Sequence, residues 1–362
     1  MSPELDPDSD LAPGPGLRAP ARLVDIAAHA GVSLKTVTRV LKQEQYVTEA
    51  TRAKVMNSVA QLAYVGDAGA SSLRTGRSGT IGMIIPDIRN GYFGLLARAV
   101  EERLSTESPT LLLGDSDEDA SQEERYLRTF RQHRVDGLIL VPAGAPSLPA
   151  AVREVPTVIV DRTVAQVAGL ADHVLADHRT ASERLVEHLV RHHGLRHVVF
   201  VGGDTAISTV ADQENGYLSV MGKAGLAPCV TSGHQTPDDA AEGAHELFRR
   251  LRPPFGVFTT NNRMFWGAVS AIARLGLTIP RDVLMTTTDA IGEATVTGLR
   301  PTQGVVPAQE VASRAMRLLS RRLVDPSLAI STVAVDIDIE FGTTCGCVPL
   351  ASSPLLAGFP PA

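Results

Sequence analysis

Basic side chains gather near the N-terminus of this 362-residue chain, which is acidic as a whole. Residues 18–77 contain nine Lys or Arg and four Asp or Glu, a local net charge of +5, although the whole chain carries −6. The other residues together therefore carry −11. Because ammonium and guanidinium groups neutralise phosphates, a basic module on an acidic body indicates a nucleic-acid-binding segment attached to a part that does not bind nucleic acid.

Histidines and cysteines, the usual ligands of zinc, occur in two places. The spacing of His188, His192 and His193 on one expected helix could hold a metal, but no nearby set of acids or cysteines completes a site, so a solvated face is favoured. Cys345 and Cys347 lie one residue apart without a matching pair elsewhere, and we expect no metal there either. The three cysteines of the chain cannot form a disulfide framework, which fits a reducing compartment.

Common catalytic motifs are absent from the sequence. There is no Walker A loop, no G-x-G-x-x-G after a strand, no G-x-S-x-G and no H-E-x-x-H, so we expect neither an enzyme nor a cofactor. Apolar residues make up 44% and the mean hydropathy is +0.05, values typical of a globular protein with a large core. With no membrane-length apolar stretch and no signal-peptide pattern, we expect a cytoplasmic location.

Residues 22–63 have the periodicity of three short helices joined by tight turns. The apolar face of the first helix consists of Leu23, Ile26, Ala27 and Ala30. Gly31 follows where a turn needs a residue free of Cβ strain, and Ser33 and Thr48 stand where they can cap the second and third helices. This pattern predicts a helix-turn-helix module, although any small helical bundle shows a similar periodicity.

The second helix of this module, expected at about 34–42, would enter the major groove of DNA with its N-terminal residues at the base edges. Its expected buried face consists of Val37, Val40 and Leu41. Its outward residues are Leu34, Lys35, Thr38 and Arg39.

Between residues 80 and 341, short apolar runs alternate with segments of helical period. The expected strands are Thr80–Ile85, Thr110–Leu113, Gly137–Val141, Thr157–Val160, Val198–Val201, Gly256–Phe258 and Val283–Thr287. The expected helices are Phe93–Ser105, Gln122–His133, Ala181–His192, Glu214–Lys223, Ala240–Arg250, Met264–Leu275 and Ala308–Arg322. The alternation predicts doubly wound parallel α/β sheets, and about 260 residues is natural for two of them side by side.

Particular runs of residues carry a family resemblance. They are Leu23-Val24-Asp25-Ile26-Ala27, Ala30-Gly31-Val32-Ser33, Thr36-Val37-Thr38-Arg39-Val40-Leu41, Val47-Thr48, Thr51-Arg52, Val55, Leu62-Ala63-Tyr64, Ser72-Leu73-Arg74-Thr75-Gly76-Arg77-Ser78, Ile81-Gly82 and Ile84-Ile85-Pro86-Asp87. Through them the chain resembles the lac repressor / galactose repressor family. The resemblance implies a helix-turn-helix headpiece followed by a core similar to periplasmic sugar-binding proteins, with two subdomains that close on a ligand.

The expected domains follow from the patterns and the resemblance together. They are a disordered tail at 1–20, the DNA-binding domain at 21–64, a hinge at 65–78, the core at 79–345 and a flexible tail at 346–362. Within the core, subdomain 1 is expected at about 79–176 and 305–325, and subdomain 2 at about 177–304 and 326–345.

The resemblance also implies DNA contacts. Leu34 and Lys35 would mainly set operator preference, because Lys35 could donate to guanine O6 and N7 while Leu34 packs on a thymine methyl. Arg39 would read a guanine or bind a phosphate. The full expected set is Leu23, Val24, Ser33, Leu34, Lys35, Thr36, Thr38, Arg39, Lys42, Tyr46, Thr48, Ala70, Leu73 and Arg74. A solvated charged face is the favoured alternative for Lys42, Arg52 and Lys54.

Residues 66–76 resemble the hinge of the family, which becomes helical only on DNA and inserts a leucine, here Leu73, into the minor groove. An ordinary linker residue is the alternative for Leu73. The usual proline, asparagine and arginine of this hinge are replaced by Gly66, Asp67 and Ser71. Because Gly69 weakens a helix by about 1 kcal/mol relative to alanine, we expect a hinge that folds less readily and Gly69→Ala to tighten operator binding.

An effector cleft between the two subdomains is also implied by the resemblance. Its expected lining is Asn90, Tyr92, Asp161, Thr209, Gln213, Asn261 and Asp289. Carboxylates and amides pair with the hydroxyls of a sugar or a related small molecule, and an aromatic ring stacks on its C–H groups. Each of these residues could instead cap a helix or end a strand.

Three contacts usual in the family are missing from this cleft. The cleft arginine is replaced by Gln213, an aromatic residue by Gln235 and a glutamine by Val306. Because a fixed guanidinium is the strongest anchor for hydroxyl pairs and carboxylates, we expect an altered or weak effector site rather than a standard hexose pocket.

The sequence therefore predicts a DNA-binding transcriptional regulator with a small-molecule effector. By family default it is a repressor, and a palindromic operator implies a homodimer. One alternative is a free ligand-binding protein, which would need an export signal and no headpiece. Another is an enzyme built on the same two-lobed core.

Overall fold

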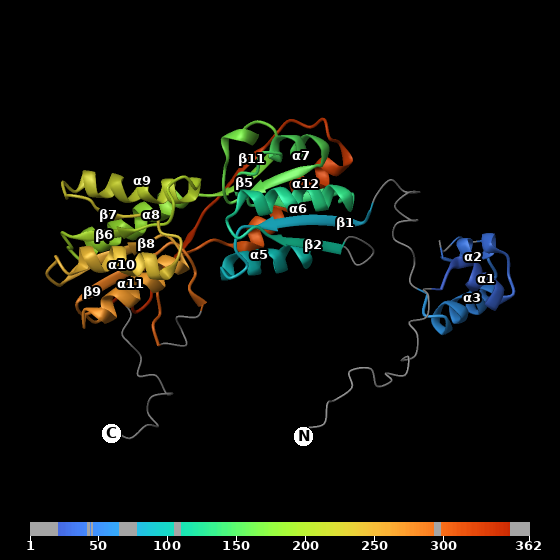
Figure 1. The fold of residues 1–362 in the computed structure, drawn as a ribbon, viewed down its shortest axis with the longest axis horizontal. Coiled ribbons are helices and arrows are strands. Elements are labelled where there is room, and N and C mark those ends of the chain that lie inside the picture. Colours follow the sequence, from blue (N-terminus) through green and yellow to red (C-terminus); the bar gives the residue numbers. More distant parts are fainter. Residues whose placement is uncertain are drawn as a thin grey trace, which may run out of the picture. The chain divides into compact units, whose positions relative to one another are not determined.

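The computed structural model of the chain describes residues 21–41, 44, 46–64, 78–104, 110–292 and 298–347. The expectations for the tail at 1–20, for residues 65–77 of the hinge and for the tail from residue 348 lie outside these residues. The chain divides into two compact units, residues 1–76 and residues 77–362 (Figure 1). We call the described part of the first unit the headpiece and that of the second the core.

The headpiece consists of three helices, α1 (Leu23–Ala30), α2 (Leu34–Leu41) and α3 (Glu49–Gln61). Its hydrophobic centre is formed by Ile26, Ala27, Val37, Val40 and Val55. As the sequence predicts, Gly31 joins α1 to α2 with a φ of 63°, in the left-handed region that favours glycine. Leu41 was expected on the buried face, but it is exposed because it is the last residue of α2 and lies beyond the edge of this small centre.

Two predicted caps begin the helices of the headpiece. The Ser33 Oγ accepts a hydrogen bond from the Thr36 amide at 3.1 Å, and the Thr48 Oγ1 accepts one from the Thr51 amide at 3.4 Å. Each cap gives an amide of the first helical turn a side-chain acceptor, which marks where α2 and α3 begin.

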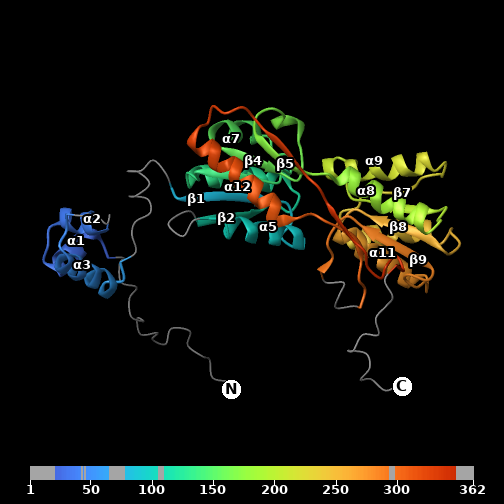
Figure 2. The same ribbon diagram turned by 180° about the vertical axis from the view of Figure 1, so that it is seen from behind.

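The core contains two lobes, each a six-stranded sheet (Figures 1 and 2). The first sheet has the order β11-β5-β4-β3-β1-β2, and all its pairs are parallel. Its strands are β1 (Thr80–Ile85), β2 (Thr110–Asp115), β3 (Gly137–Leu140), β4 (Thr157–Val160), β5 (Asp172–Ala176) and β11 (Thr332–Val335). The helices of this lobe are α5 (Gly91–Glu101), α6 (Ala120–Gln132), α7 (Leu148–Glu154), the short η1 (Ala165–Val167) and α12 (Ala308–Val324).

The second sheet has the order β12-β10-β9-β8-β6-β7 and is parallel except for the antiparallel edge pair of β10 and β12. Its strands are β6 (Val198–Val201), β7 (Cys229–Thr231), β8 (Phe255–Thr259), β9 (Val283–Thr287), β10 (Thr302–Val305) and β12 (Asp338–Glu340). Its helices are α8 (His178–Glu187), continued by the π-helical turn η2 (His188–His192), α9 (Ser208–Lys223), α10 (Pro237–Phe248) and α11 (Asn262–Arg274).

Helices cover both faces of each sheet, so the central strands are buried on both sides (Figure 2). In the first lobe, α5 and α12 pack on one face and α6 and α7 on the other. In the second lobe, α10 and α11 cover one face and α8 and α9 the other. Burial on both sides explains why these strands read as continuous apolar runs, and the predicted pair of doubly wound sheets is confirmed.

The chain passes between the lobes three times: after β5, after β10 and after β11. The prediction that residues 326–345 belong to the second subdomain is wrong for residues 332–335. This short strand pairs with β5 of the first sheet, and only after it does the chain cross to form β12. No helix among the described residues is both long and apolar enough to cross a membrane.

Candidate functional site

The first turn of α2, with Arg39 farther along the helix, presents the residues that the sequence assigns to base reading. Leu34 is 46% exposed although it is apolar, and Lys35 and Arg39 are exposed. Val37 and Val40, on the opposite side of the helix, are buried in the headpiece. The helix therefore separates an anchoring face from a free face that carries an aliphatic group and two cationic ones.

The hydroxyl groups near this turn are satisfied within the headpiece. The Ser33 Oγ lies 2.8 Å from the Thr36 Oγ1, and the Thr38 Oγ1 donates to the Leu34 carbonyl oxygen at 3.0 Å. They hold α2 in place, and a hydroxyl can turn toward another acceptor by rotation about one bond.

Two arginines of the headpiece differ in their surroundings. Arg39 lies 3.5 Å from Glu44 with both side chains more than 40% exposed, an ion pair of little energetic weight. Arg52 is only 26% exposed, and it donates to the carbonyl oxygens of Val40 at 3.4 Å and Glu44 at 3.0 Å. Arg52 thus ties α3 to the end of α2, whereas Lys54 is exposed to solvent.

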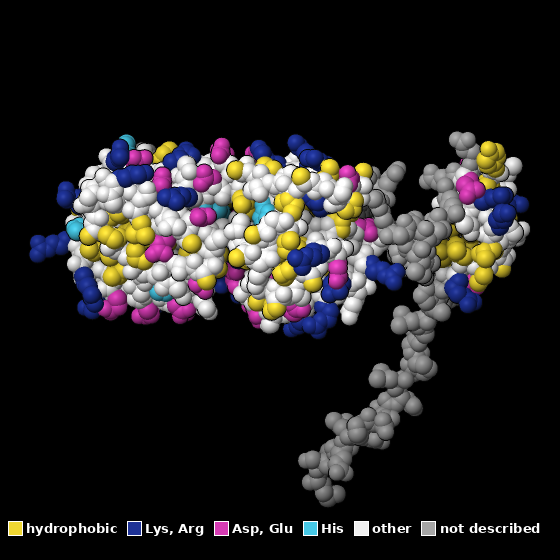
Figure 3. Space-filling model, turned by 90° about the horizontal axis from the view of Figure 1, so that it is seen from above, with side chains coloured by type: hydrophobic (Ala, Val, Ile, Leu, Met, Phe, Trp, Pro, Cys, Tyr) yellow, Lys and Arg dark blue, Asp and Glu magenta, His cyan; other side chains and the backbone are white. Residues whose placement is uncertain are grey.

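The remaining expected DNA-contacting residues differ in exposure. Val24 and Tyr46 are exposed, Tyr46 to 94%, while Leu23 is half-buried against the hydrophobic centre. Basic and hydrophobic side chains reach the surface together on the face of the headpiece drawn in Figure 3. Four of the expected residues lie outside the described residues, namely Lys42, Ala70, Leu73 and Arg74.

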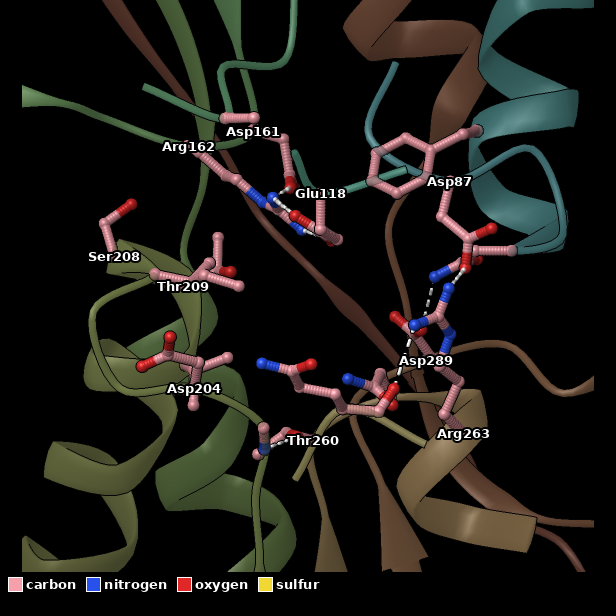
Figure 4. A pocket seen from close by; sticks show the side chains of 18 of the residues that line it. Asp87, Glu118, Asp161, Arg162, Asp204, Ser208, Thr209, Thr260, Arg263 and Asp289 are labelled. Atoms are coloured by element: carbon pink, nitrogen blue, oxygen red, sulfur yellow. Dashed lines mark hydrogen bonds and ion pairs between the residues drawn. The ribbon is translucent and has the colours of Figure 1, made fainter. Parts of the chain in front are cut away.

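In the core, a cavity of about 720 Å³ lies between the two lobes (Figure 4). It is lined by the loops that follow the carboxyl ends of strands from both sheets, where ligands of doubly wound sheets commonly bind. All seven residues expected in the cleft line it, and so do two of the replaced positions: Asn90, Tyr92, Asp161, Thr209, Gln213, Asn261, Asp289, Gln235 and Val306.

A buried polar chain crosses the cavity wall from one lobe to the other. Asp161 of the first lobe lies 3.1 Å from the Nε2 of His178, at the start of α8 in the second lobe. The other ring nitrogen of His178 lies 3.3 Å from the Gln213 Nε2, which also donates to the Thr288 Oγ1 at 2.8 Å. Gln213 therefore supports His178 instead of supplying the cationic anchor usual at its position.

The charges of Asp161 and His178 stabilise each other. Burial alone would raise the pKa of Asp161, but the hydrogen bond and the charge of His178 lower it below its ordinary value. For His178 the directions are reversed. Burial alone would lower its pKa, but the hydrogen bond to Asp161 and the charge of Asp161 raise it above its ordinary value. Asp161 also holds a φ of 68°, an unusual left-handed conformation for a residue other than glycine and one found at binding sites.

A second carboxylate, Asp289, faces the same cavity from the end of β9. Burial raises its pKa to about 6, against the opposing hydrogen bond from the Asn90 Nδ2 at 2.9 Å. Asn90 and Asn261 also cap α5 and α11, so the capping role left open by the sequence holds for both while they line the cavity. The Tyr92 Oη is buried and has no hydrogen-bond partner among the residues that the structure describes.

Arginines line the cavity although Gln213 replaces the usual one. The guanidinium of Arg162 binds Glu118 through two hydrogen bonds of 2.5 and 2.7 Å, and Arg263 of α11 binds Asp87 at 2.5 Å (Figure 4). Glu118 holds the pKa of Arg162 above its ordinary value despite burial. The sequence did not predict these pairs, and it missed His178, which follows β5, a strand that the sequence did not predict either.

Several of these contacts join the two lobes. They are Asn90 to Asp289, Asp161 to His178 and Asp87 to Arg263, together with the Thr163 amide donating to the Ser208 Oγ at 2.9 Å. All of them are polar. Because water can replace such contacts, the lobes can separate without exposing apolar surface at these points.

The histidines and cysteines give a different outcome from the sequence expectation. The expectation that no cysteine set lies near His188 and His193 is wrong, because the segment after β12 brings Cys345 and Cys347 next to them. His192 is exposed and is not part of this cluster, although its ring stacks on His188 and meets His193 edge-on, with centroids 4.9 Å apart in both pairs.

Two family models match the chain. One, described as bacterial regulatory proteins of the lacI family, matches residues 22–67, and the other, described as periplasmic binding proteins and sugar-binding domain of the LacI family, matches residues 78–321. The chain is 30% identical over 302 residues to the ribose operon repressor of Halalkalibacterium halodurans, covering 83% of this chain and 89% of that protein. It is 26% identical to the transcriptional repressor PurR of Yersinia pestis, covering 87% of this chain and 94% of PurR.

Solved structures share the fold. The lac repressor dimer bound to operator and an anti-inducer matches with a TM-score of 0.77 and 19% identity, over 90% of this chain and 99% of that one. A LacI-family regulator from Silicibacter pomeroyi matches with a TM-score of 0.76 and 21% identity over the same shares of the two chains.

Proposed function

Because this chain belongs to the lacI family of bacterial regulatory proteins, we propose that it is a repressor that binds a palindromic operator as a dimer and responds to a neutral polyhydroxylated ligand. Its family makes it a DNA-binding transcriptional regulator with a ligand-binding core. The dimer, the operator contacts, the ligand class, the absence of catalysis and a cytoplasmic location are parts of the proposal.

The observation that carries the DNA-binding part is the free face of α2. Leu34, Lys35 and Arg39 are exposed on one helix whose other side is anchored in the headpiece. Such a helix can enter the major groove, where Lys and Arg donate to guanine and an aliphatic group contacts the thymine methyl. Two-fold symmetry of a dimer would then require an operator with two inverted half-sites.

The charges of the cavity decide the class of ligand. Its lining includes three arginines, Arg89, Arg162 and Arg263, each paired with a carboxylate. It also includes seven acidic residues: Asp87, Asp117, Glu118, Asp119, Asp161, Asp204 and Asp289. This excess of acid opposes phosphorylated and carboxylated ligands, while buried carboxylates and amides suit hydroxyl groups. We therefore favour a neutral sugar or a related polyol.

The polar contacts between the lobes support a coupling between ligand and DNA. A ligand that bridges Asp161 and Asp289 would bind the closed arrangement of the lobes more tightly than an open one, and only such differential binding shifts the population. Closure would then change the geometry offered to the two headpieces of a dimer.

Fluorescence anisotropy with a labelled DNA duplex at two salt concentrations tests the DNA-binding part. Affinity should fall steeply as salt rises, and Lys35→Ala and Arg39→Ala should each weaken binding of an operator duplex by about 1–3 kcal/mol, the usual cost of losing a base contact. Arg196→Ala, which removes an exposed charge from the second lobe of the core, should leave the affinity unchanged. Equal affinities for all these proteins would contradict the assignment of α2.

Isothermal titration against neutral sugars, polyols, nucleosides and their phosphorylated forms tests the ligand class. Binding is expected for a neutral member and should be lost in Asp161→Asn. Tight binding of a phosphorylated member, with none for neutral ones, would refute the ligand proposal and leave the DNA-binding part intact.

A further inference from the structure

The end of α8 has an unusual backbone that brings two histidines together. After Glu187 the helix widens into the π-helical turn η2, closed by a hydrogen bond of 3.2 Å from the His193 amide to the His188 carbonyl oxygen. Residues five apart in an α-helix lie about 140° apart around its axis, so these two rings would point in different directions. The wider turn places them on one side, and such turns are frequent at functional sites.

The segment after β12, residues 341–347, runs beside this turn and supplies two thiols. The Cys347 Sγ lies 3.3 Å from the Nε2 of His188 and 3.3 Å from the Nε2 of His193. These two nitrogens lie 3.1 Å apart. The Cys345 Sγ completes the set, and all four ligand atoms lie within 4.8 Å of one another.

The distances among the Cys347 Sγ and the two Nε2 atoms are those of ligands around one small ion. With zinc–nitrogen bonds of about 2.0–2.1 Å and a zinc–sulfur bond of about 2.3 Å at tetrahedral angles, two nitrogens stand about 3.3 Å apart and a nitrogen and a sulfur about 3.5 Å apart. The observed 3.1 Å and 3.3 Å are close to both values. Hydrogen bonds alone explain these contacts poorly. A neutral imidazole has one ring proton to donate, yet the Nε2 atoms of His188 and His193 and the Cys347 Sγ all lie in contact with one another.

The surroundings hold the ligands in place. Cys345 is fully buried, and its sulfur accepts a hydrogen bond from the Thr302 Oγ1 at 2.9 Å. The ring of Phe341 packs on that of His188 with their centroids 4.8 Å apart. Supporting contacts of this kind fix the orientation of metal ligands.

We propose that His188, His193, Cys345 and Cys347 bind one Zn²⁺, through Nε2 of both histidines and Sγ of both cysteines. Two thiolates neutralise the charge of the ion, and thiolate with imidazole selects zinc over magnesium or calcium. Four protein ligands leave no open position, so the site is structural. It fastens the last described residues of the chain to α8, and thereby closes one end of the second lobe.

The full-length protein, purified with a reductant that does not bind metals, provides the test. Elemental analysis should find about one zinc per chain, and Co²⁺ loaded into chelator-stripped protein should give the intense visible bands and thiolate charge transfer of tetrahedral ligation. Stripping should lower the melting temperature of the core, and added Zn²⁺ should restore it.

Matched variants separate this site from adventitious binding. Cys347→Ser and His193→Ala should each lower zinc retention after dialysis against a weak chelator at least tenfold. Cys229→Ser, a thiol of β7 outside the cluster, and His192→Ala, the neighbouring imidazole, should retain it. Because Cys347 is exposed, its replacement leaves no buried hole, and circular dichroism checks the fold.

The proposal would be overturned by a reduced wild-type protein that takes up no metal with both thiols free, by a Co²⁺ spectrum without thiolate charge transfer, or by equal zinc retention in Cys347→Ser and Cys229→Ser. A Cys345–Cys347 disulfide that forms despite the reductant would likewise contradict it.

Discussion

Arg52 is expected to stabilise the headpiece, although its charge also suits a phosphate contact. Its two hydrogen bonds join a cation to the carbonyl oxygens of Val40 and Glu44 at the end of α2. Charge-assisted bonds of this kind contribute about 1.5–3 kcal/mol when well formed, and the bond of 3.4 Å to Val40 counts for less than the one of 3.0 Å. Arg52→Met keeps the aliphatic stem and should cost the headpiece about 2 kcal/mol.

Hydrogen exchange of the full chain, followed by mass spectrometry on peptides from α1, α2 and α3, measures this loss as a local opening free energy. A change of about 2 kcal/mol corresponds to exchange about 30-fold faster in the most protected amides. Lys54→Met is the matched control, since it removes the same charge from an exposed position of the same helix. Equal protection in the two variants would refute the structural role of Arg52.

Two further predictions concern the second lobe. A Cβ on Gly216 of α9 would lie 2.6 Å from the Arg179 carbonyl oxygen on α8, so Gly216→Ala should destabilise the lobe by about 1–3 kcal/mol. A Cβ on Gly222 of the same helix meets nothing within 4 Å, so Gly222→Ala should stabilise the lobe by up to about 1 kcal/mol. Urea denaturation followed by circular dichroism decides this, and shifts of the same sign would count against the close packing of α8 on α9. The raised pKa of Asp289, about 6, means that its contribution to stability is full below its ordinary value of 3.8 and is lost as the pH rises through 6. Because the side chain of Asp289→Asn cannot titrate, the stability of this variant relative to the wild type should rise between about pH 4.5 and about pH 7.5, by on the order of 2 kcal/mol or less. A difference in urea midpoints that does not change with pH would disprove the pKa shift.

Long, strongly periodic segments could be predicted from the sequence. Every expected strand and helix of the core has a counterpart, from β1 to α12, because burial on both faces leaves continuous apolar runs. The strands that escaped prediction are short or polar, namely β5, β7, β10, β11 and β12. Such strands form only because they pair with neighbouring strands. Thr332–Val335 has two exposed residues, and only its pairing with β5 makes it a strand.

The candidate sites likewise divide into residues that the sequence could assign and contacts that it could not. Residues that follow strands, such as Asp161 and Asp289, could be assigned to the cleft through the family resemblance, and they lie where the carboxyl ends of parallel strands meet. Contacts between distant segments carry no local signal. Arg263 and Asp87 are 176 residues apart in the chain, and His188 and Cys347 are 159 apart. Only the folded chain brings these groups within bonding distance.

Selection of bound duplexes from a random DNA pool by the full-length protein tests the central claim most directly. We expect enrichment of a palindrome with two inverted half-sites, and a changed half-site after substitution of Leu34 and Lys35 together. The substituted protein should keep the spacing between half-sites, since that depends on the dimer and not on α2. Recovery of no common site, or of the same site by both proteins, would contradict a repressor that reads its operator through α2.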